Sequence, residues 1–115
     1  MNPTTVYKVL TGPQMDALEA DGSFAGAPID LTDGYIHMSA AAQLTETVDK
    51  HFAGQDDLHV VAVDLDAIGE AIRWEESRGG QLFPHIYAAL PLSAVIAYSP
   101  LERDEDGRVK LPVAG

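Results

Sequence analysis

The sequence contains no cysteine. This absence excludes disulfides, zinc sites built on Cys and a thiol nucleophile, and it fits a reducing compartment. No apolar stretch approaches the roughly 20 residues that a membrane-spanning helix needs. The first ten residues also lack the charged segment and apolar run of a secretion signal. We therefore expect a soluble cytoplasmic protein that has no membrane partner.

Basic residues are also scarce, with 7 Lys and Arg against 18 Asp and Glu, for a net charge of -11. The basic residues are scattered, whereas nucleic acids are bound by clustered Lys and Arg, so we expect no nucleic-acid partner. Acidity of this kind mainly favours solubility. The apolar fraction of 46% in 115 residues is sufficient for one core, which predicts a single domain over residues 1–115.

The apolar pattern predicts two helices and five or six strands, with helices early and strands late, which is typical of an α+β fold. A capping box at Thr11 predicts a helix that ends at Gly22. Apolar residues at every fourth position from Leu44 to Phe52 predict the second helix, with Ser39 as its N-cap. The remaining expectations are a loop at 23–33, strands at 6–10, 35–38, 58–65, 72–76, 83–87 and 94–98, and a hairpin tip at 106–107.

Three of these stretches, 35–39, 72–77 and 83–87, carry polar or aromatic residues at alternate positions. Successive side chains of a strand point to opposite faces, so each stretch has one polar face and one apolar face. The polar faces would hold Tyr35, His37 and Ser39 in the first stretch, Arg73 and Glu75 in the second, and His85 and Tyr87 in the third. We expect these faces to line one cleft, with His37 and His85 within a ligand's width of each other.

The residue types allow several kinds of site. Glu75 can act as a general base or bind a ribose hydroxyl, Arg73 can clamp a phosphate, and histidine can donate, accept or bind a metal. The structural alternatives are a cross-strand ion pair of Arg73 or Glu75 on a solvated face and histidines satisfied by backbone carbonyls. Two His and one carboxylate can also hold a mononuclear metal, although close-spaced ligand signatures are absent. A non-catalytic module that binds a nucleotide or small molecule is the remaining alternative.

The segments at 33–39 (DGYIHMS), 73–75 (RWE) and 83–87 (FPHIY) together resemble a known bacterial family, the domains of unknown function numbered 952. The resemblance extends from Val6 to about Ser99. The chain departs from the family pattern at Ala88, where Gly is common, and at Ala40, where Thr is frequent. Neither departure affects the polar set.

The resemblance implies a fold similar to the ADP-ribosyltransferases, in which a split antiparallel sheet holds nicotinamide adenine dinucleotide (NAD) in a cleft. In those enzymes an early-strand His or Arg holds the adenosine-side ribose, an aromatic residue stacks on nicotinamide, and a Glu or His acts on the reacting ribose. Related enzymes that transfer a 2'-phosphate from RNA carry basic residues that this acidic chain lacks. His37 and Ser39 match the early-strand motif of these enzymes. Together with the alternation, the resemblance predicts ADP-ribosyl transfer or glycohydrolysis with NAD as cofactor, bound by His37, Ser39, Arg73 and Tyr87. Glu75 is then the expected catalytic carboxylate, and His85 is the competing catalytic candidate.

Overall fold

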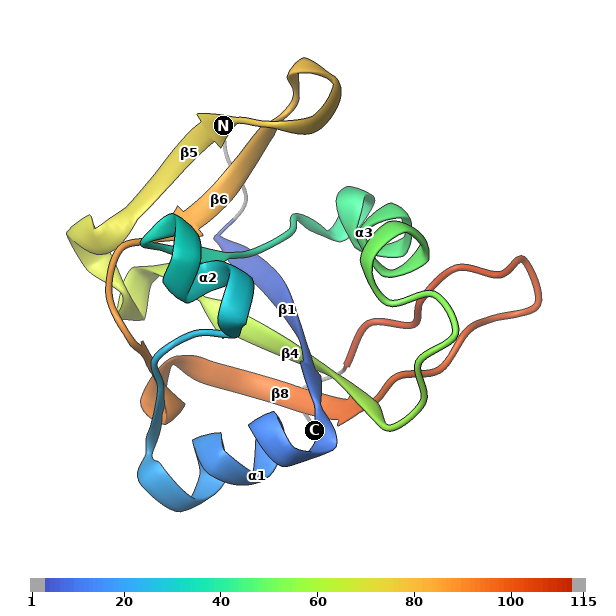
Figure 1. Cartoon of the computed structure of the whole chain (residues 1–115), viewed down its shortest axis with the longest axis horizontal. Helices are drawn as coiled ribbons and strands as arrows, with labels where there is room; N and C mark the ends of the chain where they lie inside the picture. Colours follow the sequence, from blue (N-terminus) through green and yellow to red (C-terminus); the bar gives the residue numbers. More distant parts are fainter. Residues whose placement is uncertain (1–3, 113–115) are drawn as a thin grey trace.

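The computed structural model describes residues 4–112, which form an α+β fold of antiparallel sheets and three α-helices (Figure 1). No helix among these residues is long and apolar enough to cross a membrane. Single turns of 3-10 helix connect several of the elements. The elements are β1 (Thr5–Thr11), α1 (Gly12–Asp21), β2 (Ser23–Phe24), α2 (Pro28–Asp33), β3 (Ile36–His37), α3 (Leu44–His51), β4 (Leu58–Asp64), β5 (Ile72–Glu76), β6 (Leu82–Ile86), β7 (Leu90–Pro91) and β8 (Val95–Pro100).

The strands form two three-stranded sheets that meet at one point. One sheet has the order β1-β4-β8 and the other the order β3-β6-β5, while β2 and β7 form a small third sheet. The two larger sheets are joined where Tyr7 of β1 and Ser39 exchange two backbone hydrogen bonds of 2.8 Å. Beyond this bridge, toward His37, β1 and β3 separate. The backbone N–H and C=O groups of β3 that face β1 must therefore be bound by side chains.

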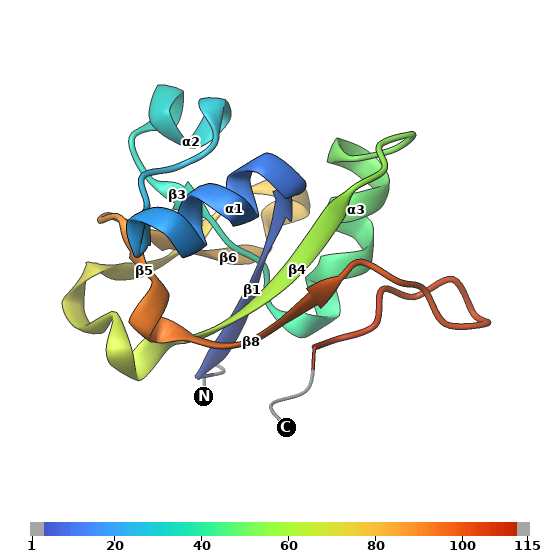
Figure 2. The same ribbon diagram turned by 90° about the horizontal axis from the view of Figure 1, so that it is seen from below.

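Two apolar cores lie on the two faces of β1 and β4. Alternate residues of β1 point to opposite faces, so Val6 and Leu10 join one core and Val9 joins the other. The larger core contains Leu18 of α1, and the smaller core is covered by α3. Figure 2 shows α1 and α3 on either side of β1 and β4. Strand β4 is buried on both faces, since Val60, Val61, Ala62 and Val63 are all buried.

Two expectations about the helices are wrong. Segment 23–33 is not a loop, because it contains β2 and the third helix, α2. Helix α2 has only six residues, too few for a visible apolar period, and its signals are local: Pro28 in its first turn and Gly34 in the left-handed conformation (φ 87°) at its end. Ser39 is not an N-cap either, because it pairs with Tyr7, and a 3-10 turn after Ala40 precedes α3.

The capping box at Thr11 is confirmed. The Gln14 backbone N–H donates to the Thr11 hydroxyl (3.3 Å), and the Thr11 N–H donates to the Gln14 side chain (2.9 Å). We expect Thr11→Ala to lower the free energy of unfolding by about 1 kcal/mol, measured by urea denaturation, because one N–H at the helix start loses its acceptor. Thr11→Ser keeps the hydroxyl and should retain wild-type stability. Equal stability of the alanine variant would show that the cap contributes nothing.

Candidate functional site

The sheet β3-β6-β5 brings the polar positions onto one face, as the alternation in the sequence predicts. In the antiparallel register His37 lies opposite His85, and His85 lies opposite Arg73. The intervening residues Ile36 and Ile86 point the other way and are buried in the larger core. We call this face of the sheet, made of Tyr35, His37, Arg73, Glu75, His85 and Tyr87, the His–Tyr face. His85 is itself buried, with 3% of the residue exposed.

Tyr35 lies at the centre of the His–Tyr face. Its ring stacks on His85, with 4.2 Å between ring centres, and lies 4.7 Å from His37 and 5.1 Å from Tyr87. The His37 and His85 rings are 5.5 Å apart, which confirms that they lie within a ligand's width. The sequence analysis placed Tyr35 on this face and gave it no role, although its alternation with His37 was the available signal.

Glu75 is fixed by two neighbours on the His–Tyr face. The Tyr87 hydroxyl donates to Glu75 Oε1 at 2.6 Å, and His85 Nδ1 lies 2.8 Å from the same oxygen. The hydrogen bond from Tyr87, followed by that from His85, lowers the pKa of the Glu75 carboxyl. The bond to Glu75 in turn raises the pKa of the Tyr87 hydroxyl. Glu75 is therefore an ionised carboxylate, and with 39% of its side chain exposed it can contact a ligand.

Arg73 lies at the edge of this surface. Its guanidinium carbon is 5.5 Å from the centre of the Tyr87 ring, which is within range for a cation–π contact. Arg73 is exposed and forms no ion pair with any residue that the structure describes, whereas Glu75 contacts His85 across the strands. Its charge is free to contact an anionic group of a ligand.

Asp30 of α2 binds His37 on its buried side, a role that was not predicted from the sequence. Asp30 is 2% exposed. Its Oδ1 lies 2.6 Å from His37 Nδ1 and accepts the His37 backbone N–H at 3.1 Å. Its Oδ2 accepts the Ala27 N–H at 2.8 Å and lies 3.0 Å from Lys8 Nζ. One carboxylate thus fixes the ring of His37, its backbone and the start of α2.

The Lys8–Asp30 pair fills the gap where β3 separates from β1. Lys8 is 8% exposed, and its ammonium group also donates to the His37 carbonyl at 2.9 Å. Both backbone groups of His37 that face β1 are therefore bound by side chains instead of by a neighbouring strand. Burial lowers the pKa of Lys8, and the charge of Asp30 opposes this shift. The pair links the two sheets directly behind the His–Tyr face.

A second carboxylate contacts the other edge of the His37 ring. Asp33 Oδ2 lies 2.9 Å from His37 Nε2, and 38% of the Asp33 side chain is exposed. Both ring nitrogens thus face carboxylate oxygens, and both hydrogen bonds form together only when each nitrogen carries a proton. Asp33 was not among the site residues predicted from the sequence.

Ser39 is directed away from this cluster. Its hydroxyl is hydrogen-bonded with that of Thr47 on α3 at 2.9 Å, and the residue is 4% exposed. The structure therefore brings together His37, Arg73, Glu75, His85 and Tyr87, while the Ser39 hydroxyl contacts α3. Within residues 4–112, no group of three His, Asp or Glu side chains is arranged to hold a metal ion.

A protein-family model matches most of this chain, including the residues of the site. The model of the family described as "protein of unknown function (DUF952)" matches residues 9–98. The chain belongs to this family. The match includes every residue of the DUF952 chain's His–Tyr face, together with Asp30 and Asp33, and it begins one residue after Lys8.

Solved structures support the DUF952 fold. The X-ray crystal structure of protein CC0527 from Caulobacter crescentus is 44% identical to this chain, with a TM-score of 0.85, and the alignment covers 93% of this chain and 94% of that one. The solution NMR structure of CC0527 is 44% identical, with a TM-score of 0.78 and coverage of 92% and 91%. No curated protein matches the chain. The function must therefore be argued from the site.

Stability at acid pH tests the contacts of Asp30 in the DUF952 chain. Burial raises the pKa of Asp30, but hydrogen bonds from His37 and the charge of Lys8 outweigh it and lower the pKa from 3.8 to about 2. A lowered pKa adds stability above pH 4, about 2 kcal/mol here, which is lost as the pH falls toward 2. Urea denaturation between pH 5 and 2 should show this loss in the wild type and not in Asp30→Asn. Equal slopes of the free energy of unfolding against pH in the wild type and in Asp30→Asn would contradict the prediction.

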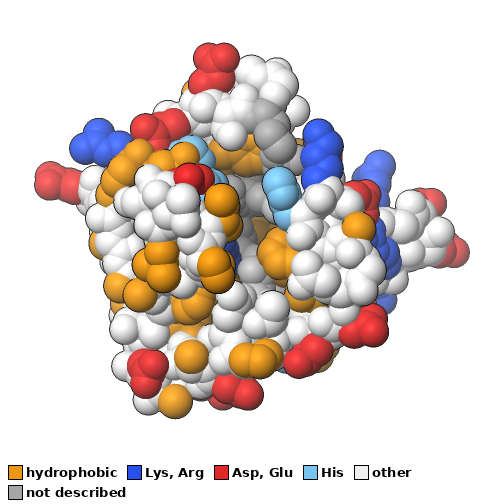
Figure 3. Space-filling model, in the orientation of Figure 1, with side chains coloured by type: hydrophobic (Ala, Val, Ile, Leu, Met, Phe, Trp, Pro, Cys, Tyr) orange, Lys and Arg blue, Asp and Glu red, His pale blue; other side chains and the backbone are white. Residues whose placement is uncertain are grey.

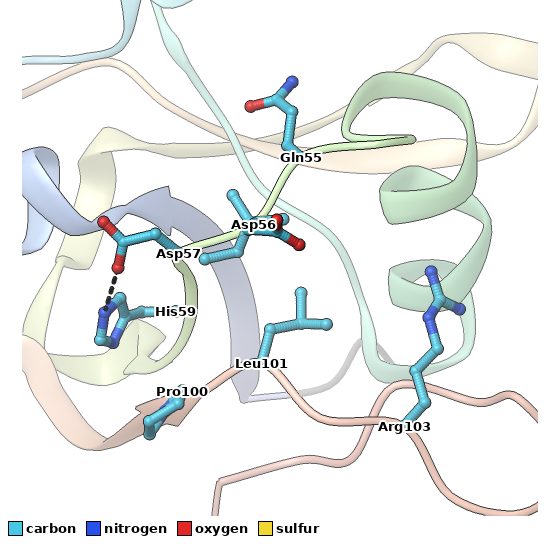
Figure 4. Close-up of a pocket in the computed structure, with 8 residues that line it drawn as sticks. Gln55, Asp56, Asp57, His59, Pro100, Leu101 and Arg103 are labelled. Atoms are coloured by element: carbon cyan, nitrogen blue, oxygen red, sulfur yellow. Dashed lines mark ion pairs between the residues drawn. The ribbon is translucent and has the colours of Figure 1, made fainter.

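The described residues of the DUF952 chain leave hollows on its surface. Figure 3 shows one between the part that carries α2 and the part that carries α3, with histidine side chains beside it. Another is a cavity of about 480 Å³ between residues 55–59 and 100–103 (Figure 4). There His59 Nε2 lies 3.8 Å from Asp57, and His59 Nδ1 is buried with no hydrogen-bond partner among the described residues. This cavity shares no residue with the His–Tyr face.

Proposed function

We propose that this protein binds NAD or a related ADP-ribosyl compound on the His–Tyr face and acts on its nicotinamide–ribose bond, by ADP-ribosyl transfer or by glycohydrolysis. The observation that carries this proposal is the fixed, ionised and partly exposed Glu75 carboxylate beside two tyrosine rings. A group of this kind suits a reaction in which positive charge develops on a sugar.

Cleavage of the nicotinamide–ribose bond creates such a charge. The bonding electron pair leaves with nicotinamide, and positive charge builds on the ribose. A carboxylate next to that ribose stabilises the charge and orients the 2'-hydroxyl, and electrostatic stabilisation is usually the largest catalytic contribution. The oxygen of water or of an acceptor then bonds to the ribose carbon and releases a proton. His85, held through Nδ1 by Glu75, is the competing candidate for this acid–base role.

The remaining residues of the face have binding roles in this proposal. Tyr87 is 42% exposed and offers a ring for stacking, with Tyr35 beside it. Arg73 has no ion pair with a described residue and binds the pyrophosphate. His37 holds the adenosine-side ribose, as an early-strand residue does in the ADP-ribosyltransferases whose fold the family resemblance implies. The separation of the two sheets beyond the Tyr7–Ser39 bridge supports the comparison with their split sheet.

A non-catalytic binding module is the second candidate. One observation favours it: both partners of Glu75 bind the same oxygen, and the carboxylate is already engaged without a ligand. A module of this kind would use the same aromatic surface and the same Arg73 to hold a nucleotide and would leave its glycosidic bond intact.

A thermal-shift screen with NAD, ADP-ribose, other nucleotides and divalent metals tests the proposal, followed by an assay of nicotinamide release. A ligand that binds only the folded state raises the melting temperature, by several degrees at concentrations far above its Kd. We expect NAD to raise it and to be cleaved. A shift without nicotinamide release would favour the binding module. Neither shift nor release would overturn the proposal, and a metal-dependent shift reversed by chelator would favour a metal site.

A further inference from the structure

We infer that Asp33 makes this site select a ribose with free hydroxyls and reject a phosphorylated ribose at His37. The inference rests on the proposed function, because it concerns the adenosine-side ribose that His37 would hold. It adds a residue that determines specificity and a ligand class, namely ADP-ribosyl compounds without a 2'-phosphate.

Only one edge of the His37 ring can contact a ligand. Nδ1 is bound to Asp30, whose side chain is 1% exposed, so this edge faces the interior. The His37 side chain as a whole is 32% exposed, and its other nitrogen, Nε2, meets Asp33. Any group that binds His37 at Nε2 therefore also meets the Asp33 carboxylate.

Asp33 lies at a helix position where a carboxylate is unfavourable. Asp33 is the last residue of α2, and carboxylates are disfavoured at the C-terminal end of a helix, where the carbonyl groups are already negative. No basic residue in the last turn offsets it. Its described partner is His37 Nε2, at 2.9 Å. A residue that breaks a local preference in order to contact a binding side chain is typical of a functional position.

The His37–Asp33 pair distinguishes a hydroxyl group from a phosphate group. A ribose hydroxyl that displaces the direct 2.9 Å contact between the two groups can accept a hydrogen bond from His37 Nε2 and donate one to Asp33. A phosphate only accepts, so it gains the bond to His37 and is repelled by the Asp33 carboxylate. Dinucleotide-binding proteins in general use an acidic residue to bind the 2'-hydroxyl and an arginine to accommodate a 2'-phosphate.

The nearby cations do not remove this repulsion. Lys8 is buried and bound to Asp30 and to the His37 carbonyl, so its charge is directed inward. Arg73 lies two strands away from His37, beside the Tyr87 ring. Glu75 adds a further negative charge to the same surface. Asp33, 2.9 Å from His37 Nε2, is therefore the carboxylate that opposes an anionic group bound at this nitrogen.

The test compares the Kd of ADP-ribose with that of 2'-phospho-ADP-ribose, which both lack the bond to nicotinamide and stay intact during calorimetry. We expect the wild type to bind ADP-ribose about tenfold more tightly or better, since one close like-charge contact is worth about that much. In Asp33→Asn the ratio should fall toward one, mainly because the phosphorylated ligand gains affinity. Asp16→Asn, which removes an equal charge from the exposed face of α1, should keep the wild-type ratio.

A wild-type ratio near one, or an unchanged ratio in Asp33→Asn, would overturn the inference while binding of ADP-ribose continued to support the proposed function. Failure of the wild type to bind either ligand would overturn the proposed function, and this inference with it. Asp33→Ser, which is shorter and also uncharged, provides a second variant. A ratio that falls in both variants supports selection by the charge of Asp33.

Discussion

Glu75→Gln should reduce nicotinamide release from NAD by about a hundredfold or more, because removal of one group that stabilises the charge of a transition state typically costs 10²–10³ in rate. Glutamine has the same shape, and its amide oxygen still accepts the hydrogen bond that Tyr87 donates at 2.6 Å. The variant therefore removes the charge with little change in packing. We expect the affinity for NAD to change by less than about threefold, since the charge acts on the transition state and much less on the bound substrate.

The neighbouring residue provides the matched control for this variant. Glu76 lies on the same strand, is exposed and points to the opposite face of the sheet, so Glu76→Gln removes an equal charge outside the site. It should release nicotinamide at the wild-type rate. His85→Ala separates the two catalytic candidates. If Glu75→Gln matches the wild type while His85→Ala is inactive, the surface is correct and the carboxylate assignment is wrong.

The strand positions of the site were predictable from the sequence because strand alternation is a local property. Each of the three stretches repeats at a period of two, and a one-residue slip in register would have buried the polar residues. The structure keeps Ile36, Ile86 and Trp74 toward the core, so the opposite positions share one surface. Ser39 is where the alternation ends: β3 stops at His37, and the chain turns to pair with Tyr7, which directs Ser39 to α3.

Asp30, Asp33 and Lys8 were not predictable in the same way, because their roles depend on contacts between distant parts of the chain. Lys8 and Asp30 are separated by 22 positions, and nothing in either segment indicates the other. Asp30 also lies in a helix too short for a clear apolar period, within a segment that reads as a loop. The element order of the α+β fold follows from local patterns, whereas the support behind His37 follows from tertiary packing.

Asp30→Ala should lower the free energy of unfolding by about 3–5 kcal/mol, because removal of one partner leaves the other charge of a buried pair uncompensated. Lys8 would keep only the His37 carbonyl as a hydrogen-bond partner among those seen here. The N–H groups of Ala27 and His37 would also lose their acceptor, which adds to the cost. Urea denaturation at pH 7 measures the change. Asp33→Asn, at a partly exposed position, should cost less than about 1 kcal/mol.

A double-mutant cycle distinguishes the ion pair from the general cost of changing a buried site. Lys8→Met keeps the apolar stem of the side chain. Asp30→Asn keeps one of the two oxygens that accept the N–H groups of Ala27 and His37. The double variant removes both charges together and leaves neither one alone in the gap between β1 and β3. It should be more stable than the sum of the two single changes predicts, by about 1–3 kcal/mol, which is the range for residues in direct contact. Additive effects would mean that Lys8 and Asp30 are not coupled.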